Sequence, residues 1–205
     1  MSQWLPHVAA AGMLLLAAAC TRPPAQLYVL NPIAAPDGFH APTSDARTLA
    51  ILPVSVPDYL DRRQIVARTS DHRLLLSDAD HWGENLQDAL ARVLTIDLGR
   101  LLAPDGFVVT SGGHQPKVDG EVSLTVDAFE IDSGGRALLA ARWMVLGERG
   151  NESPRHFQAV YSEPVASGAG DTHAAAEVAA LNRDLDRLAD DMARSVRQSL
   201  PRRRR

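Results

Sequence analysis

The sequence predicts an α+β domain of two layers, in which a mainly antiparallel sheet is packed by two long helices. Apolar residues recur at helical spacing in two stretches, 86–102 and 178–196. The other segments are short, rich in β-branched and aromatic residues, and bounded by Pro, Gly and Asp. Strands, a helix, more strands and a last helix therefore follow one another, and this order is typical of the α+β class.

The composition is that of a globular protein. The chain has 205 residues, 45% apolar and 22% charged, with a net charge of −4. Without the terminal run Arg202–Arg205 the balance is 17 basic against 25 acidic residues, or −8. An acidic body argues against nucleic acid as a partner. We expect the basic tail, residues 201–205, to be solvated; contact with lipid phosphates is the alternative.

The beginning of the chain predicts a lipoprotein. Residues 8–19 are apolar but too short to span a bilayer, which takes about 20 residues. They have the length of a signal-peptide apolar region and end at Cys20, the only cysteine. A signal that stops at a cysteine resembles a bacterial lipobox. We therefore expect residues 1–19 to be a signal peptide and Cys20 to carry a covalent lipid such as palmitate. The alternative is an ordinary secretory signal.

The first half of the mature chain is expected to be mostly strands. Residues 20–25 form a lipidated tether, and a strand over 26–30 opens a single periplasmic domain, 26–200. Residues 31–47 contain three prolines and predict a surface loop. Residues 48–56 predict a strand that is bulged or at an edge, because Pro53 cannot donate to a ladder.

A hairpin and the first helix follow. Residues 64–69 and 73–77 predict two short strands around a turn. The helix is expected to start near Asp78 or Asp80, since acidic residues favour a first turn, and to end before Pro104.

The second half predicts strands and then the last helix. The alternation within 118–131 changes phase near Ala128, which predicts a β-bulge. Residues 137–146 are apolar on both faces and predict a central strand. A helix capped by Asp171 or Thr172 follows, and its apolar stripe is expected to pack in the core rather than to act as a zipper. Trp82 and Trp143 are also expected in the core.

The sequence carries no signature of an enzyme. The histidines are scattered without metal-ligand spacing, and we find no nucleophile-plus-base motif, P-loop or dinucleotide fingerprint. We therefore predict neither catalytic nor metal-binding residues, and no cofactor besides the lipid on Cys20.

Several motifs resemble one family. Residues 52–66 read Leu-Pro-Val-Ser-Val-Pro-Asp-Tyr-Leu-Asp-Arg-Arg-Gln-Ile-Val, and Arg68-Thr69-Ser70, Phe129-Glu130-Ile131-Asp132 and Leu139-Ala140-Ala141-Arg142-Trp143 follow. Together they resemble the PqiC-like auxiliary lipoproteins of ABC-type intermembrane transport. The resemblance implies a lipoprotein on the inner leaflet of the outer membrane, facing the periplasm. It also implies a partner, an MCE-domain protein of the inner membrane that forms a lipid conduit. Thr21, which is not aspartate, agrees with the outer membrane.

A docking protein needs a rigid surface that a partner can reach. We expect the strand 48–56 to accept a partner strand, with Tyr59, Leu60, Arg62 and Arg63 in the following turn as contact residues. The alternative is that Tyr59 and Leu60 cap the core and the arginines are solvated.

Two other functions stay open from the sequence. The protein could be a periplasmic carrier that binds lipid in an apolar pocket, or a structural envelope lipoprotein without a role in transport. A ring of several copies would match a ring-shaped conduit.

Overall fold

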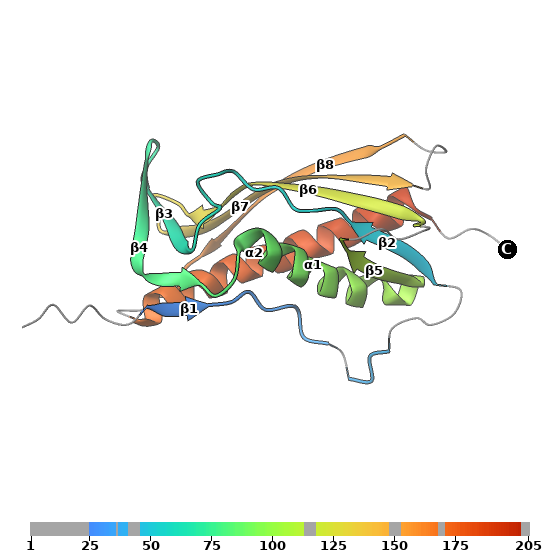
Figure 1. Ribbon diagram of the computed structural model, residues 1–205, viewed down its shortest axis with the longest axis horizontal. Helices are drawn as coiled ribbons and strands as arrows, with labels where there is room; N and C mark the ends of the chain where they lie inside the picture. Colours follow the sequence, from blue (N-terminus) through green and yellow to red (C-terminus); the bar gives the residue numbers. More distant parts are fainter. Residues whose placement is uncertain are drawn as a thin grey trace, which may run out of the picture.

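Two helices lie on one face of an eight-stranded mixed sheet (Figure 1). The computed structural model describes residues 25–35, 37–40, 46–112, 118–147, 153–167 and 171–201. The predictions on the signal peptide, on Cys20 and on the arginine tail lie outside these residues. The elements in chain order are β1 (Gln26–Tyr28), β2 (Arg47–Ile51), β3 (Gln64–Ser70), β4 (Arg73–Trp82), α1 (Leu86–Leu102), the short 3₁₀ helix η1 (Ala103–Asp105), β5 (Phe107–Ser111), β6 (Gly120–Ile131), β7 (Arg136–Gly147), β8 (Arg155–Pro164) and α2 (Asp171–Ser199).

The long strand β6 organises the sheet. One of its edges pairs with β7 in an antiparallel ladder, and β7 pairs with β8 in the same way. Its other edge is shared between β2, near the start of β6, and β3, near its end. The α+β class with two long helices is confirmed. The longest ladders are antiparallel, while β1–β4, β2–β5, β2–β6 and β3–β6 pair in parallel, so the sheet is mixed.

The predicted bulge and central strand are both confirmed. The register of β6 against β7 shifts between Val126 and Ala128. This shift lets Phe129 and Ile131 point into the core on the same face as Val122 and Val126. The strand β7 lies between β6 and β8, as its apolar sequence predicts.

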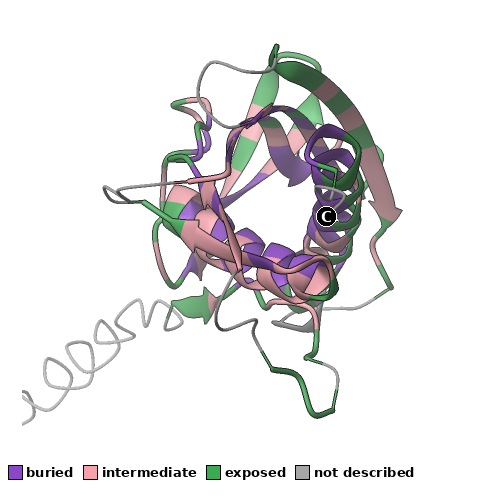
Figure 2. Ribbon diagram, turned by 90° about the vertical axis from the view of Figure 1, so that its right-hand side faces the viewer, coloured by how far each residue is buried: buried purple, intermediate pink, exposed green. Residues whose placement is uncertain are grey.

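The helices bury the stripes that the sequence predicts. Every member of the α2 stripe is buried, so the prediction of core packing is confirmed; these residues are Val178, Leu181, Leu185, Leu188, Met192 and Val196. The buried residues gather where the helices face the sheet (Figure 2). Trp82 and Trp143 are both in the core, as expected.

The predicted start of the first helix is wrong. Asp78 and Asp80 belong to β4, which runs on to Trp82 and pairs there with β1. The carboxylate of Asp80 accepts the Tyr28 hydroxyl of β1 at 3.2 Å, so it serves a tertiary contact rather than a helix end. The N-cap of α1 is Asn85, whose side-chain oxygen accepts a backbone N–H.

Of the two alternatives predicted for 48–56, the edge strand is wrong and the bulge near Pro53 is confirmed. The strand β2 ends at Ile51 and lies between β5 and β6. Beyond it the chain continues along β6, where the N–H of Leu52 donates to the Val122 carbonyl at 2.8 Å and that of Ser55 to the Leu124 carbonyl at 3.0 Å. Ile51 is registered with Val122 and Ser55 with Thr125, so one extra residue bulges out around Pro53, where no N–H is needed.

The segment after β1 crosses both helices, and we name residues 29–35 the strap. On the α2 side, Asn31 exchanges two hydrogen bonds with the Asn182 side chain, at 2.8 and 3.0 Å. On the α1 side, the Ile33 N–H donates to Asp97 at 2.8 Å, and Arg92 donates to the Leu30 carbonyl at 3.0 Å. Helix side chains therefore satisfy backbone groups that no neighbouring strand pairs.

The Asp97 carboxylate that holds the strap is fully buried. Burial raises the pKa of Asp97 to about 6, and the Ile33 N–H opposes this shift.

A buried ion pair joins β3 to β6. Arg68 Nε lies 2.6 Å from Glu130 Oε1, and the Glu130 side chain is 1% exposed. The ladder between these strands has one registered pair, Ala67 with Ile131. The ion pair therefore reinforces the junction between the β3–β4 hairpin and the rest of the sheet.

We expect Arg68→Ala to lower the free energy of unfolding by about 3 kcal/mol, because it leaves the Glu130 carboxylate buried and unpaired. Urea denaturation of the purified protein measures this change. The matched control is Arg142→Ala, which breaks the exposed Arg142–Asp127 pair and should change stability little. Equal losses in the two variants would contradict a special role for the buried pair.

Replacing each of two glycines with alanine should change the stability of the fold in opposite directions. At Gly120 an added Cβ would overlap the side chain of Leu200 and lie 3.2 Å from the Leu146 carbonyl oxygen, so we expect Gly120→Ala to cost about 1–3 kcal/mol. At Gly99, inside α1, the nearest atom outside the helix would be Val109 Cβ at 4.0 Å, so Gly99→Ala should add about 0.5–1 kcal/mol through helix propensity. Thermal unfolding tests both, and a Gly120→Ala variant as stable as the parent would show that α2 can shift its end.

Candidate docking surface

The face of the sheet that the helices leave uncovered is unusually apolar on β7. Alternate β7 residues such as Leu139 and Trp143 point into the core. Four of the residues between them point to the opposite face and are apolar and half-buried; they are Leu138, Ala140, Met144 and Leu146. A solvated face of an antiparallel sheet is normally polar, so this face is suited to contact with another molecule. We call it the helix-free face.

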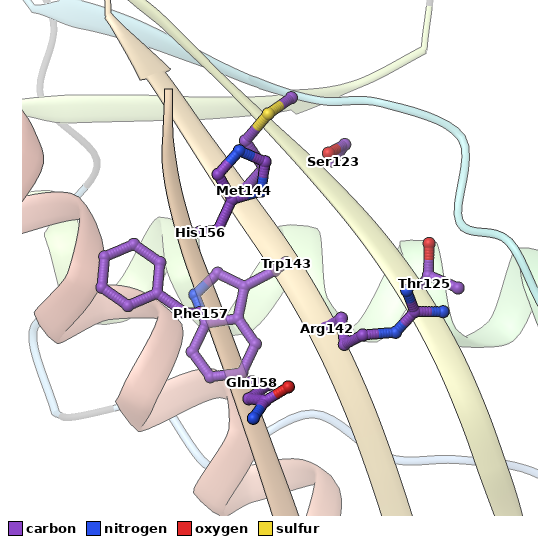
Figure 3. A pocket seen from close by; sticks show the side chains of 8 residues that line it. All are labelled: Ser123, Thr125, Arg142, Trp143, Met144, His156, Phe157 and Gln158. Carbon is purple, nitrogen blue, oxygen red and sulfur yellow. The ribbon is translucent and has the colours of Figure 1, made fainter. Parts of the chain in front are cut away.

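A hollow of about 470 Å³ lies on the helix-free face (Figure 3). Its lining comes from β6, β7 and β8 and consists of Ser123, Thr125, Arg142, Trp143, Met144, His156, Phe157 and Gln158. Its side chains are mixed, with Met144 beside His156 and Arg142 reaching toward Thr125 (Figure 3). Val160 of β8, which is 70% exposed, extends the apolar surface beside it.

One ion pair borders the hollow. Arg142 donates from Nε and Nη2 to the two carboxylate oxygens of Asp127, at 2.8 and 2.7 Å. The hydrogen bond from Arg142 lowers the pKa of Asp127. Bidentate pairing fixes the orientation of both side chains, and it presents a rigid charged group on an otherwise apolar strand.

The turn predicted as a contact surface lies next to this ion pair. The Tyr59 hydroxyl donates to the Asp127 carbonyl at 3.3 Å, and Arg62 donates to the Tyr59 carbonyl at 2.6 Å. Burial, and then the negative charge of Glu130, raise the pKa of Tyr59 to about 12. Tyr59 and Arg62 are half-buried and Arg63 is exposed, so three of the predicted residues can be reached at this turn.

The fourth predicted residue cannot be reached. Leu60 is 1% exposed and packs in the core, which corrects its assignment as a contact residue. Addition of a partner strand at 48–56 is excluded along β2 itself, because both edges of β2 are already paired.

Sequence reasoning missed Arg142 and Asp127 as members of this surface. A signal was present, since Arg142 is the one charged residue within the apolar run 137–146. The contact with Tyr59 had no local signal, because Asp127 is 68 positions away in the chain.

Neither a metal centre nor a membrane span is found in the part of the chain that the structure covers. Its His, Cys, Asp and Glu side chains form no group of three that could hold a metal ion. Neither α1 nor α2 is apolar enough along its length to cross a bilayer.

Known proteins share both the sequence and the fold. The chain is 27% identical over 160 residues to the intermembrane transport lipoprotein PqiC of Escherichia coli, an alignment that covers 77% of this chain and 81% of the relative. A crystal structure of an uncharacterized protein has the same fold, with a TM-score of 0.67 and 21% identity, over 84% of this chain and 99% of the other. The crystal structure of a Xanthomonas campestris protein also has this fold, with a TM-score of 0.62 and 17% identity, over 85% of this chain and 96% of the other.

A family model for the ABC-type transport auxiliary lipoprotein component matches residues 28–193, which include every strand from β2 to β8, all of α1 and most of α2. The chain therefore belongs to the family of ABC-type transport auxiliary lipoprotein components.

Proposed function

We propose that this protein is an outer-membrane lipoprotein that docks the far end of an MCE-domain conduit during ABC-type intermembrane lipid transport. Membership of the auxiliary lipoprotein family and the likeness to PqiC, an intermembrane transport lipoprotein, support this role. Such a protein would be anchored by the lipid on Cys20 and would face the periplasm. Assembly of several copies into a ring around the conduit belongs to the same proposal.

The observation that carries the docking role is the helix-free face, on which β7 presents half-buried apolar side chains between the polar side chains of β6 and β8. Both described helices lie on the opposite side of β6–β8 (Figure 1). An apolar patch with a polar rim is typical of protein interfaces, and Tyr and Arg are common at their centres. Here Arg142 lines the hollow with the half-buried Met144, and its partner Asp127 accepts the Tyr59 hydroxyl through its carbonyl, so the surface has the composition of a docking site.

The alternative of a lipid carrier receives less support. A carrier needs unfilled apolar space, and the natural place for it is between the sheet and α2. Leu181, Leu185 and Leu188 are each fully buried there, within the core shared with β7. A structural lipoprotein without a transport role would give no specific inner-membrane partner.

Crosslinking in cells tests the docking surface. A photoreactive amino acid at Gln158, on the rim of the hollow, should capture an MCE-domain protein. The same amino acid at Asp88, exposed on α1, is the matched control and should not. Capture at Asp88 alone would move the interface to the helices, and no inner-membrane partner at either position would discard the docking role.

A paired substitution then tests the anchors of the interface. We expect Tyr59→Ala with Arg142→Ala to reduce capture at Gln158 about tenfold or more, since such residues often contribute 2 kcal/mol or more to binding. Asp88→Ala should leave capture unchanged. Undiminished capture in the double variant would show that the contact does not depend on these two side chains.

The anchor makes a separate prediction. Cys20→Ala should remove the acyl mass from the mature amino terminus and release the protein from membranes, as measured by mass spectrometry and detergent partitioning. Thr21→Asp is the control, because it keeps the cysteine and should move the lipoprotein to the inner membrane in sucrose-gradient fractions. A mature wild-type chain without acyl mass would establish an ordinary secretory signal instead.

A further inference from the structure

The N-terminal segment exposes an unusual share of large apolar side chains. Six such residues stand out as exposed in the part of the chain described; they are Leu27, Val29, Phe39, Leu52, Leu75 and Val160. The first three fall within residues 27–39, and Leu27 and Val29 are 61% and 49% exposed. This segment runs along the lower side of the molecule in Figure 1, opposite the helix-free face, and Figure 2 shows residues 37–40 descending on the same side.

The side-chain alternation around β1 presents this apolar character outward. Tyr28 and Leu30 pack against or within the core, so Leu27 and Val29 point the other way. The neighbour of Val29 is Gly83, whose N–H donates to the Tyr28 carbonyl at 2.7 Å. A glycine has no side chain with which to cover Val29.

The segment is fixed to the body of the protein. β1 pairs with β4 over three residues, and the Tyr28 hydroxyl donates to Asp80 at 3.2 Å. Immediately after it, Asn31 is held by Asn182 of α2 and Ile33 by Asp97 of α1. The position of Leu27 is therefore tied to that of both helices.

The short tether brings this segment to the membrane. Five residues, 21–25, separate Cys20 from β1, and fully extended they reach about 18 Å. If Cys20 is acylated, β1 must lie within that distance of the bilayer surface.

Groups of both charges surround the strap. Asp186 and Asp190 of α2 lie close enough to Asp97 to raise its pKa, while Arg92 and Arg100 of α1 donate to carbonyls of the strap. A lipid contact through the exposed apolar side chains should therefore not require anionic lipid.

We propose that Leu27, Val29 and Phe39 rest in the headgroup–acyl boundary of the bilayer, as a second contact beside the lipid on Cys20. Because β1 and the strap are fixed to the sheet and to both helices, this contact would orient the domain with the strap side toward the membrane and the helix-free face toward the periplasm. The inference rests on the proposed lipidation of Cys20 and adds to it which surface meets the membrane.

Site-specific fluorescence tests this orientation in the intact lipoprotein. Acylation occupies the only native cysteine, so Leu27→Cys introduces a unique thiol for a nitrobenzoxadiazole label. In phosphatidylcholine vesicles, acyl-brominated lipid should quench a label at position 27, which would lie about 5–10 Å deep. The label at Val160→Cys, on the opposite face and 70% exposed, is the matched control and should keep its emission.

Further variants keep the test decisive. Phe39→Cys gives an independent label position that should also be quenched. Adding Val29→Asp to the labelled Leu27→Cys protein should reduce quenching while the thermal unfolding temperature stays unchanged, because Val29 is exposed.

Each outcome separates this inference from the proposed function. Acylated protein with no quenching at positions 27 and 39, or with equal quenching at 27 and 160, would overturn the fixed orientation and leave the docking role standing. An amino-terminal peptide without acyl mass would instead refute the anchor itself.

Discussion

The structure depends on pairing the backbone N–H and C=O groups along one edge of β6. Three segments do this in turn: β2, the stretch around Ser55, and β3. Ser55 both donates to Leu124 and accepts from Val126, so the pairing continues past the end of β2. The chain must then cross to reach β3, and the crossing brings the turn with Tyr59 onto the helix-free face beside Asp127. The site thus follows from the hydrogen bonding of the sheet.

The parts of the fold that sequence predicts well are those set by local periodicity. The stripes of both helices, the bulge of β6 and the central place of β7 all follow from apolar spacing. Predictions fail where a distant partner decides. Asp80 has the chemistry of a helix cap, yet Tyr28 and Ser77 use its carboxylate, and Asn85 caps the helix instead.

The same distinction applies to the candidate site. The turn with Tyr59 and Arg62 was predicted, but Leu60 looks equally exposed in sequence and is buried, because its neighbours come from the core of the folded domain. Arg142 interrupts an apolar strand, which indicates an unusual role, but its partner Asp127 becomes evident only from the register of β6 against β7. The apolar residues on both faces of β7 predict a strand that is buried in the centre of the sheet. Because the described helices cover only one face, the apolar residues on the other face also indicate a contact surface.

The ends of the described chain are tied together over long sequence distances. Asn31 bonds Asn182 across 151 positions, and Arg47 donates to the Leu200 carbonyl across 153. The contacts of Asn31 and of the Arg47 side chain with the end of the chain can therefore form only after the last helix has been made, and contacts so distant in sequence make folding slow. Because α2 supplies one side of the core against β7, the core cannot close before the carboxyl-terminal helix has been made.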